Sequence, residues 1–89
     1  MNEYQIEFTK AASKQLKKLP KEEQTRIRNK IDELAENPRP DGGVKLTDSE
    51  NSYRIRVSNY RVLYDIFDDI LLVSVVKVRH RKDVYRKKS

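Results

Sequence analysis

Residues 53–64 read YRIRVSNYRVLY, two short runs in which apolar and arginine side chains alternate around a central Ser-Asn pair. Alternation with a period of two indicates half-buried strands, and Asn tolerates the left-handed backbone that tight turns require. The stretch therefore predicts a β-hairpin with a two-residue loop. The register that follows pairs Val57 with Tyr60, Arg56 with Arg61, Ile55 with Val62, and Tyr53 with Tyr64.

The arginines of this hairpin, Arg54, Arg56 and Arg61, fall on the face opposite the apolar side chains. Directly opposed residues have Cβ atoms only about 4.5–5.5 Å apart. Two unit charges about 6 Å apart repel by roughly 1 to 3 kcal/mol, depending on the local dielectric. Two interpretations are open: the long side chains splay into solvent, or the face binds a polyanion between them.

Upstream of the hairpin, the sequence predicts one strand and two helices. Residues 4–8, YQIEF, alternate as a strand does. Apolar residues then recur at helical spacing over 11–19, and Thr9 is placed to cap that helix. A second helix begins with Pro20 in its first turn, and Pro38 stops it. Its apolar stripe comprises Ile27, Ile31, Leu34 and Ala35.

Downstream of the second helix, NPRPDGG at 37–43 is a clear loop, and 44–46 is expected to be a short strand. Two further strand-like runs follow, 60–67 and 70–78, joined by Asp68 and Asp69. The last three strands therefore predict an antiparallel meander. The fold class is α+β: an N-terminal strand and a helical hairpin packed on one face of an antiparallel β-sheet meander, followed by a short basic C-terminal segment.

The net charge of +6 is concentrated at the C-terminus. The tract 77–88, KVRHRKDVYRKK, holds seven of the 20 Lys and Arg residues and one of the 14 acidic residues, so bases and acids balance at 13 each elsewhere. Such a tract is either a solvated tail or a contact with a polyanion. The interleaved Val78, Val84 and Tyr85 favour a structured contact.

The composition argues against several classes of protein. We expect a single domain over residues 1–89, because 36% hydrophobic content supplies one modest core. No apolar run approaches the ~20 residues that span a bilayer, and the start MNEYQIEF lacks a signal-peptide pattern, so we expect no membrane contact and a cytoplasmic location. With no Cys and one His, and no cluster at ligand spacing, we expect no metal and no cofactor.

Several motifs, in this order, resemble the RelE branch of the RelE/ParE toxin superfamily: YRIRVSNYRVLYDI, a hydrophobic strand, and VRHRKDVY. Members resemble Tyr-[Lys/Arg]-[Ile/Leu]-[Lys/Arg], followed by Gly-Tyr-Arg-[Leu/Val]-[Leu/Val]-Tyr and a basic strand end that leads to Val-Tyr. The resemblance covers nearly the whole chain and includes NPRP after the second helix and the Lys45-Leu46 pair. It implies a helical hairpin on an antiparallel sheet, in agreement with the interpretation from the residues.

The resemblance also implies a toxin of a type II toxin–antitoxin system. RelE members are ribosome-dependent endoribonucleases (mRNA interferases) that enter the A site of the 30S subunit and cleave mRNA, and an acidic RelB-like antitoxin neutralises them. The implied chemistry is attack by a ribose 2′-OH on the adjacent phosphate. The protein must align the nucleotide, stabilise the developing charge and move two protons. The expected partners are therefore the antitoxin, the ribosome and mRNA.

Six residues match the catalytic positions of this branch or lie beside them: Arg54, Arg56, Arg61, Arg79, His80 and Tyr85. Some members use a strand lysine as general base where this chain has Arg54, and an arginine cannot be expected to release its proton. His80, as the one imidazole, is a candidate for that role, and Tyr85 is its competitor. Alternatively, His80 is a solvated surface residue, and Tyr85 stacks on a base or packs the C-terminal segment onto the sheet.

A further set of basic residues is assigned to RNA binding: Lys45, Lys77, Arg81, Lys82, Arg86 and Lys87. Two rival functions remain open. ParE-like toxins share this fold but inhibit DNA gyrase by binding, and they generally lack the basic and tyrosine residues named above. A plain nucleic-acid-binding module is the third interpretation, favoured if the C-terminal tract is disordered.

Overall fold

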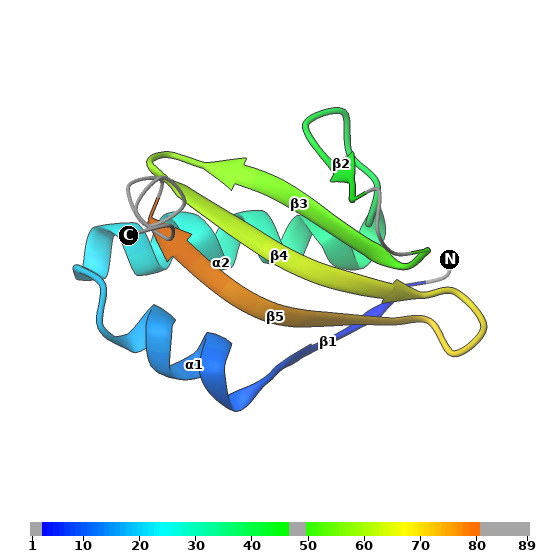
Figure 1. The fold of residues 1–89 in the computed structure, drawn as a ribbon, viewed down its shortest axis with the longest axis horizontal. Helices are drawn as coiled ribbons and strands as arrows, with labels where there is room; N and C mark the ends of the chain where they lie inside the picture. Colours follow the sequence, from blue (N-terminus) through cyan, green and yellow to red (C-terminus); the bar gives the residue numbers. More distant parts are fainter. Residues whose placement is uncertain (1–2, 47–49, 81–89) are drawn as a thin grey trace.

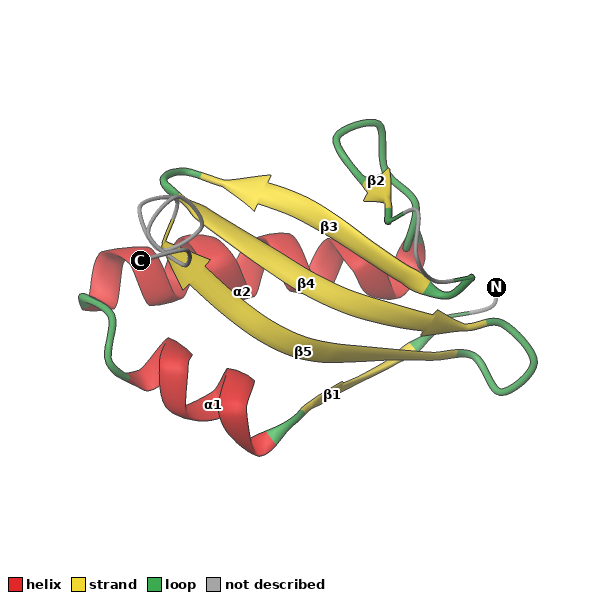
Figure 2. Cartoon of the chain, in the orientation of Figure 1, coloured by secondary structure: helices red, strands yellow, loops and turns green. Residues whose placement is uncertain are grey.

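The structure, a computed structural model, describes residues 3–46 and 50–80 (Figure 1). Its elements in chain order are β1 (Gln5–Phe8), α1 (Lys10–Lys17), α2 (Lys21–Glu36), β2 (Val44–Lys45), β3 (Ser52–Val57), β4 (Tyr60–Phe67) and β5 (Leu72–His80). The strands form one sheet in the order β1-β5-β4-β3-β2. Both helices lie against one face of this sheet and leave the other face open (Figure 2). The predicted α+β class is confirmed.

The β3–β4 hairpin has the predicted register. Val57 pairs with Tyr60 and Arg56 with Arg61, so the Ser-Asn pair forms a two-residue loop. Ser58 takes the left-handed conformation, with a φ of 57°. The side chains of Ile55, Val57, Val62 and Tyr64 enter the core, and the arginines of the hairpin lie on the open face of the sheet together with Leu63.

The helices bury most of the stripes that the sequence predicts, but Ala35 is only half-buried and Ala11 is exposed. Thr9 caps α1, because its side chain accepts a hydrogen bond of 3.1 Å from the backbone N–H of Ala12. Pro20 is the residue before α2 rather than part of its first turn, and α2 ends at Glu36, next to Asn37. The core-facing residues of the two helices are Ala12, Leu16, Ile27, Ile31 and Leu34.

The position of β1 is a feature that the sequence did not predict. This strand pairs parallel to β5 at the edge of the sheet, with Ile6 beside Val73. The other three strand pairs are antiparallel. A parallel pair needs a long crossover, and the chain between β1 and β5 includes both helices and the rest of the sheet.

The turn between β4 and β5 is longer than predicted. Phe67 pairs with Leu72, so residues 68–71 form the turn and β5 begins at Leu72 instead of Ile70. Leu71 has a positive φ of 52°. The carboxylate of Asp68 accepts hydrogen bonds from Arg39 and Tyr4. Asp68 therefore connects the turn to the loop after α2 and to the N-terminal segment, and it does not form the predicted two-residue turn with Asp69.

A β-bulge in β5 determines which of its side chains reach the open face. Leu63 pairs with Lys77 but Tyr64 pairs with Val75, so Val76 is an extra residue in β5. Before the bulge, odd-numbered residues such as Val75 are buried, and after it the even-numbered Val78 is buried. The bulge therefore turns Lys77 and Arg79 toward the open face.

None of the helices in the described ranges is long and apolar enough to cross a membrane.

Candidate functional site

The open face of the sheet carries a row of three arginines across three strands. Arg56 on β3 pairs with Arg61 on β4, and Arg61 pairs with Arg79 on β5. Arg56 is exposed, whereas Arg61 and Arg79 are partly buried. The Nε atom of Arg61 is buried and has no hydrogen-bond partner among the described residues. A buried donor of this kind indicates a place where an anion can complete the bonding.

A second row lies two residues further along each strand. Arg54 on β3 pairs with Leu63 on β4, and Leu63 pairs with Lys77 on β5. Together with the first row, this forms what we call the basic face: Arg54, Arg56, Arg61, Lys77 and Arg79. Within residues 3–46 and 50–80, the ion pairs involve other cations, namely Arg26, Lys30 and Arg39. The positive charge of the basic face is therefore not neutralised by any described acid.

The third row is polar and ends the basic face. Ser52 on β3 pairs with Asp65 on β4, and Asp65 pairs with Ser74 on β5. The hydroxyl of Ser52 donates a hydrogen bond of 2.6 Å to Oδ1 of Asp65. Charge thus changes sign along β4, from Arg61 through Leu63 to Asp65, over four residues.

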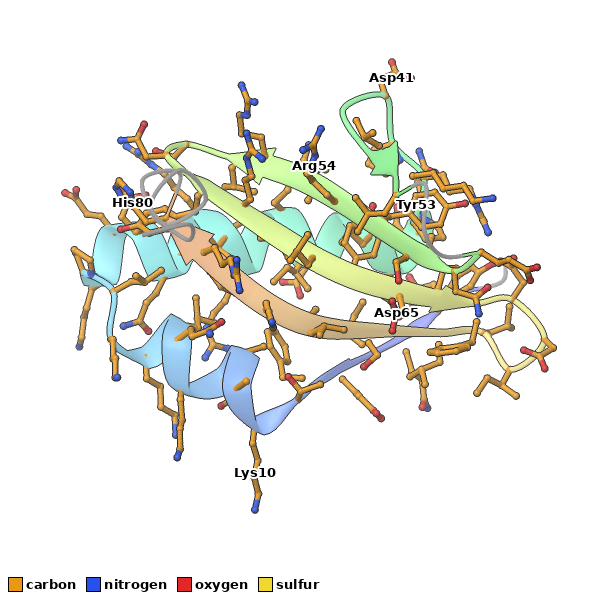
Figure 3. The ribbon with its side chains drawn as sticks, in the orientation of Figure 1. Lys10, Asp41, Tyr53, Arg54, Asp65 and His80 are labelled. Carbon is orange, nitrogen blue, oxygen red and sulfur yellow. The ribbon has the colours of Figure 1, made fainter. Side chains whose placement is uncertain are left out.

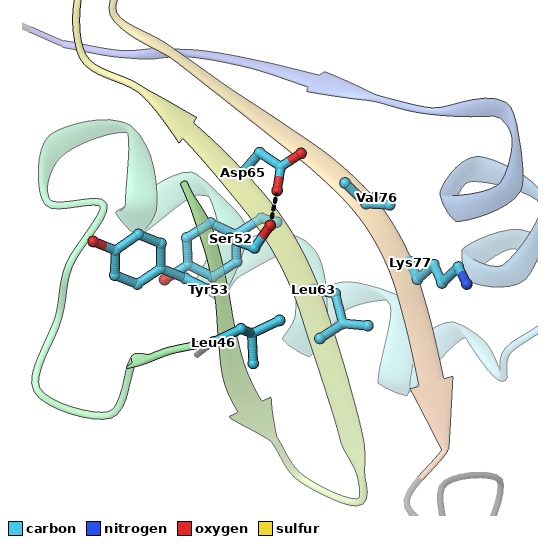
Figure 4. A pocket seen from close by; sticks show the side chains of 8 residues that line it. Leu46, Ser52, Tyr53, Leu63, Asp65, Val76 and Lys77 are labelled. Atoms are coloured by element: carbon cyan, nitrogen blue, oxygen red, sulfur yellow. Dashed lines mark hydrogen bonds between the residues drawn. The ribbon is translucent and has the colours of Figure 1, made fainter. Parts of the chain in front are cut away.

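A hollow of about 240 Å³ lies between the second and third rows (Figure 4). We call it the Leu63 hollow, after one of the residues that line it. Its lining residues are Leu46, Ser52, Tyr53, Leu63, Tyr64, Asp65, Val76 and Lys77. Apolar side chains meet the carboxylate of Asp65 there, and Lys77 lines the hollow with its ammonium group pointing away from Leu63 (Figure 4). Of these residues only Lys77 was predicted as a site residue. Five others lie in the stretches that resemble the family but were assigned no role there: Leu46, Tyr53, Leu63, Tyr64 and Asp65. Strand register and the bulge bring the set together.

The structure does not bring His80 to the basic face. His80 pairs with Tyr60 in the sheet, and the two rings pack edge to face with their centroids 5.0 Å apart. Tyr60 packs against the core, so His80 lies on the helix-covered side of β5, although its neighbour Arg79 lies on the open side. The catalytic role of His80 stays a prediction, and the structure places the residue on the face of β5 opposite the arginines.

Lys45 is also separated from the arginines. It pairs with Tyr53, whereas Val44 is the residue that pairs with Arg54. Because successive side chains in a strand alternate between faces, Lys45 lies on the face opposite the basic face. The remaining predicted site residues are outside the described part of the chain: Arg81, Lys82, Tyr85, Arg86 and Lys87. Figure 3 shows Arg54 and His80 on their strands.

A second polar cluster, which sequence reasoning missed, joins the loop after α2 to the β4–β5 turn. Arg39 donates to both carboxylate oxygens of Asp68, at 3.2 and 2.7 Å, and to the hydroxyl of Tyr53 at 3.1 Å. The hydroxyl of Tyr4 donates a hydrogen bond of 2.5 Å to Asp68. Arg39, followed by Tyr4, holds the pKa of Asp68 below its ordinary value.

This cluster also helps to place β3. The guanidinium of Arg39 lies 5.4 Å from the ring centroid of Tyr53, which stacks on Tyr64. Tyr64 donates a hydrogen bond of 2.9 Å to the carbonyl of Pro38, and burial raises its pKa to about 12. The NPRP segment therefore anchors the loop to the sheet, away from the basic face. In the sequence, the NPRP motif was the only signal that this loop is anchored to the sheet.

No three His, Asp or Glu side chains of the described ranges are arranged so that they could hold a metal ion.

Comparison with known proteins finds related sequences and structures over nearly the whole chain. A family model described as the ParE toxin of the type II toxin–antitoxin system parDE matches residues 6–85. A RelE-like toxin protein of Escherichia coli is 35% identical over 86 residues, covering 92% of this chain and 90% of the relative. The mRNA interferase toxin RelE of Escherichia coli is 31% identical with the same coverage.

Solved structures agree with this relationship. The isolated RelE toxin of Escherichia coli has a TM-score of 0.78 and 29% identity, covering 96% of this chain and 94% of that chain. The archaeal RelE in a RelE–RelB complex from Pyrococcus horikoshii has a TM-score of 0.80 and 28% identity, covering 91% and 97%. From the match of the family model and the extent of these relatives, we conclude that the chain belongs to the RelE/ParE family and is a RelE-like toxin of a toxin–antitoxin system.

Proposed function

We propose that this toxin is a ribosome-dependent endoribonuclease that cleaves mRNA in the A site of the 30S subunit. The observation that carries the proposal is the unneutralised row of Arg56, Arg61 and Arg79, whose central member has a buried Nε without a described partner. RNA supplies a phosphate that can bind across such a row. A relative named an mRNA interferase toxin is 31% identical over 86 residues, which supports this activity.

The reaction requires little covalent chemistry from the protein. The ribose 2′-oxygen forms a bond to the adjacent phosphorus, and the bond from phosphorus to the 5′-oxygen of the next nucleotide breaks. The products are a 2′,3′-cyclic phosphate and a 5′-hydroxyl. One proton leaves the 2′-hydroxyl and another reaches the 5′-oxygen. DNA lacks the 2′-hydroxyl and is not a substrate.

The basic face fits the electrostatic part of this reaction. Negative charge grows on the phosphate oxygens as the 2′-oxygen attacks, and a guanidinium can donate two parallel hydrogen bonds to them. Donors held in place before the reaction stabilise that charge without reorganising. Arg61 lies centrally between Arg56 and Arg79 and is therefore assigned the closest contact with the reacting phosphate. In this scheme the guanidinium groups supply the positive charge, and the reaction requires no metal ion.

The two proton transfers are not assigned to the arginines of the basic face. Arg54 lies on the basic face but retains its proton, so it aligns the substrate rather than acting as a base. His80 packs on Tyr60 on the other side of the sheet. Tyr85, outside the described residues, remains the sequence-based candidate for stacking on a base or for proton transfer, and ribosomal RNA can supply further groups.

A second candidate function is favoured by the description of the matching family model, which names ParE. A ParE-like toxin would inhibit DNA gyrase by binding and would cleave nothing. The arginine row across three strands, without an acidic partner in the described part of the chain, favours the ribonuclease, because such a row can stabilise the charge that develops on a reacting phosphate.

Primer extension on translated mRNA, after brief induction of the toxin, tests the proposal. New 5′ ends in register with codons are expected only from the ribonuclease. The matched control is the variant Arg61→Ala, which should produce none. If growth arrest occurs without new 5′ ends, and purified toxin inhibits supercoiling by gyrase, the ParE-like function replaces the one proposed here.

A further inference from the structure

The Leu63 hollow begins one row beyond the arginine row that would bind the phosphate. Leu63 and Lys77 belong to the second row of the open face, and Ser52 and Asp65 belong to the third. Successive rows are separated by two residues of a strand, which is about 6.6 Å. A single nucleotide can therefore place its phosphate on the basic face and its base in the hollow.

The floor of the hollow suits a flat ring. Leu46, Leu63 and Val76 line it with aliphatic side chains. Val76 is present there only because of the bulge, which adds this residue to β5 opposite the step from Leu63 to Tyr64. The volume of about 240 Å³ is large enough to accommodate one nucleobase.

The carboxylate of Asp65 forms one wall of the hollow. Oδ1 of this carboxylate accepts from Ser52 at 2.6 Å, and Oδ2 accepts no hydrogen bond from the described residues. An ionised carboxylate has about four acceptor sites and no donor. It therefore favours a base edge that presents amino and imino hydrogens and repels one that presents carbonyl oxygens.

We propose that the Leu63 hollow is a nucleobase subsite in which Asp65 selects a base that carries an amino group, with guanine as the best match. Guanine presents an imino and an amino hydrogen side by side, which one carboxylate can accept together. Uracil presents a single imino hydrogen between two carbonyl oxygens and is disfavoured. This inference rests on the proposed ribonuclease activity and adds to it a residue that determines specificity.

The test uses ribosomes programmed with defined messages in which each of the three A-site positions is varied to all four bases. Single-turnover cleavage rates are measured for the wild type and for Asp65→Asn. At one codon position the wild type should cleave guanine over uracil by roughly 5- to 150-fold, the range for one good bidentate contact. In Asp65→Asn, whose amide presents one acceptor and one donor edge, that ratio should fall toward unity.

Glu7→Gln is the matched control. Glu7 is an exposed carboxylate that pairs with Ser74 and continues the third row onto β1, outside the hollow. Glu7→Gln changes the net charge by the same amount as Asp65→Asn. A general gain of RNA affinity from the lost negative charge should therefore appear in both variants. Base ratios are compared within each protein, and a loss of folded protein therefore cancels.

Base ratios in Asp65→Asn that equal those of the wild type at all three positions would overturn the subsite, as would a wild type that shows no base preference. If the ratios are unchanged but the variant binds its antitoxin less tightly, the hollow is a protein-docking site instead. A wild type that cleaves no message would reject the ribonuclease function itself, and the subsite with it.

Discussion

At the scale of single residues, Arg61 is the side chain on which the proposed chemistry most depends. It lies on the middle of the three strands that carry the arginine row, with Arg56 on one side and Arg79 on the other. Its buried Nε lacks a described partner, and leaving such a donor unsatisfied typically costs about 1–3 kcal/mol. A fold that retains this arrangement is consistent with an anion that binds there during function.

The first prediction is that Arg61→Ala abolishes cleavage without unfolding the protein. Loss of one positioned donor to a developing oxyanion typically lowers the rate by about 10²- to 10³-fold. Stability should stay the same or rise, because repulsion between arginines is relieved and no core side chain is removed. Arg79→Ala should behave alike.

Arg28→Ala, on the exposed surface of α2, is the control for the loss of one positive charge. Cleavage and thermal unfolding are measured on all three variants. A large fall in Tm in Arg61→Ala or Arg79→Ala would show that these arginines are structural.

A second prediction concerns proton transfer. Because His80 packs on Tyr60 away from the basic face, we expect His80→Gln to cleave at nearly the wild-type rate. A general base in that position would instead show a loss of about 10²- to 10⁴-fold. Such a loss in single-turnover cleavage, with ribosome binding intact, would return His80 to the catalytic site.

Tyr85 is tested by a pair of substitutions. Stacking on a base predicts that Tyr85→Phe retains cleavage and that Tyr85→Ala loses it, because phenylalanine keeps the aromatic face without the hydroxyl. Proton transfer predicts strong loss in both.

The third prediction concerns stability at acid pH. Arg39, and to a lesser extent Tyr4, hold the pKa of Asp68 below its ordinary value of 3.8. The folded protein therefore binds this proton less readily than the unfolded chain. The stabilisation is present above pH 3.8 and is lost as the pH falls through the lower pKa of the folded state. Asp68→Asn should lower Tm at neutral pH and show a smaller further decline on acidification.

Asp69→Asn alters the neighbouring exposed carboxylate of the same turn and should retain the acid dependence of the wild type. The measurement is Tm across the acid range for the three proteins. Parallel curves for the wild type and Asp68→Asn would show that the pair with Arg39 contributes nothing to stability.

At the scale of elements, α1 supports the part of β5 that carries Lys77 and Arg79. β1 pairs with β5 only as far as Val75, so the following backbone groups of β5 need other partners on that side. Thr9 donates its hydroxyl hydrogen to the carbonyl of Val76 at 2.8 Å, and the side-chain oxygen of Gln15 accepts from the N–H of Val78 at 2.7 Å. Residues from the start and the middle of α1 thus replace the missing strand.

The fourth prediction follows from the contact of Gln15. Gln15→Ala leaves the N–H of Val78 without its acceptor, which should lower the free energy of unfolding by about 1–3 kcal/mol. Cleavage should fall as well, because Arg79 follows Val78 directly and depends on the position of this strand end. Lys14→Ala, at an exposed position of α1, should change neither quantity. Unchanged Tm and cleavage in Gln15→Ala would show that water replaces the side chain without loss.

At the scale of the whole molecule, charge and packing are divided between the two faces of the sheet. The helices cover one face, and its core contains no buried polar or charged residue among those described. The other face carries five cations that no described acid neutralises. With a net charge of +6, the molecule should attract polyanions over a distance set by the ionic strength.

The fifth prediction is that an acidic, partly disordered antitoxin encoded next to this toxin covers the basic face and folds as it binds. Co-expression should relieve growth arrest and yield a stable complex at moderate salt. Its affinity should fall between 0.15 M and 1 M salt, because the screening length shrinks from about 8 Å to about 3 Å. A neighbouring gene product that neither relieves arrest nor forms a complex would contradict this.

Local pattern was sufficient to predict much of the fold. The hairpin register, the Thr9 cap and the buried stripe of α2 depend on residues within a few positions of one another, and these features are confirmed. Periodicity and turn chemistry act over such short ranges. The position of Arg56 opposite Arg61 therefore followed from the sequence alone.

Contacts between distant segments decided the rest. The parallel position of β1 depends on a crossover that includes both helices. The bulged part of β5 contacts residues more than 60 positions away: the carbonyl of Val76 accepts from Thr9, and the N–H of Val78 donates to Gln15. That bulge reverses the alternation of β5, so that Lys77 and Arg79 join the basic face while His80, their neighbour in sequence, lies on the other side. The sequence by itself determined which residues are basic and which strands carry them. Only tertiary structure decided which side chains of β5 join the arginines of the hairpin, because one extra residue in a strand moves every later side chain to the opposite side of the sheet.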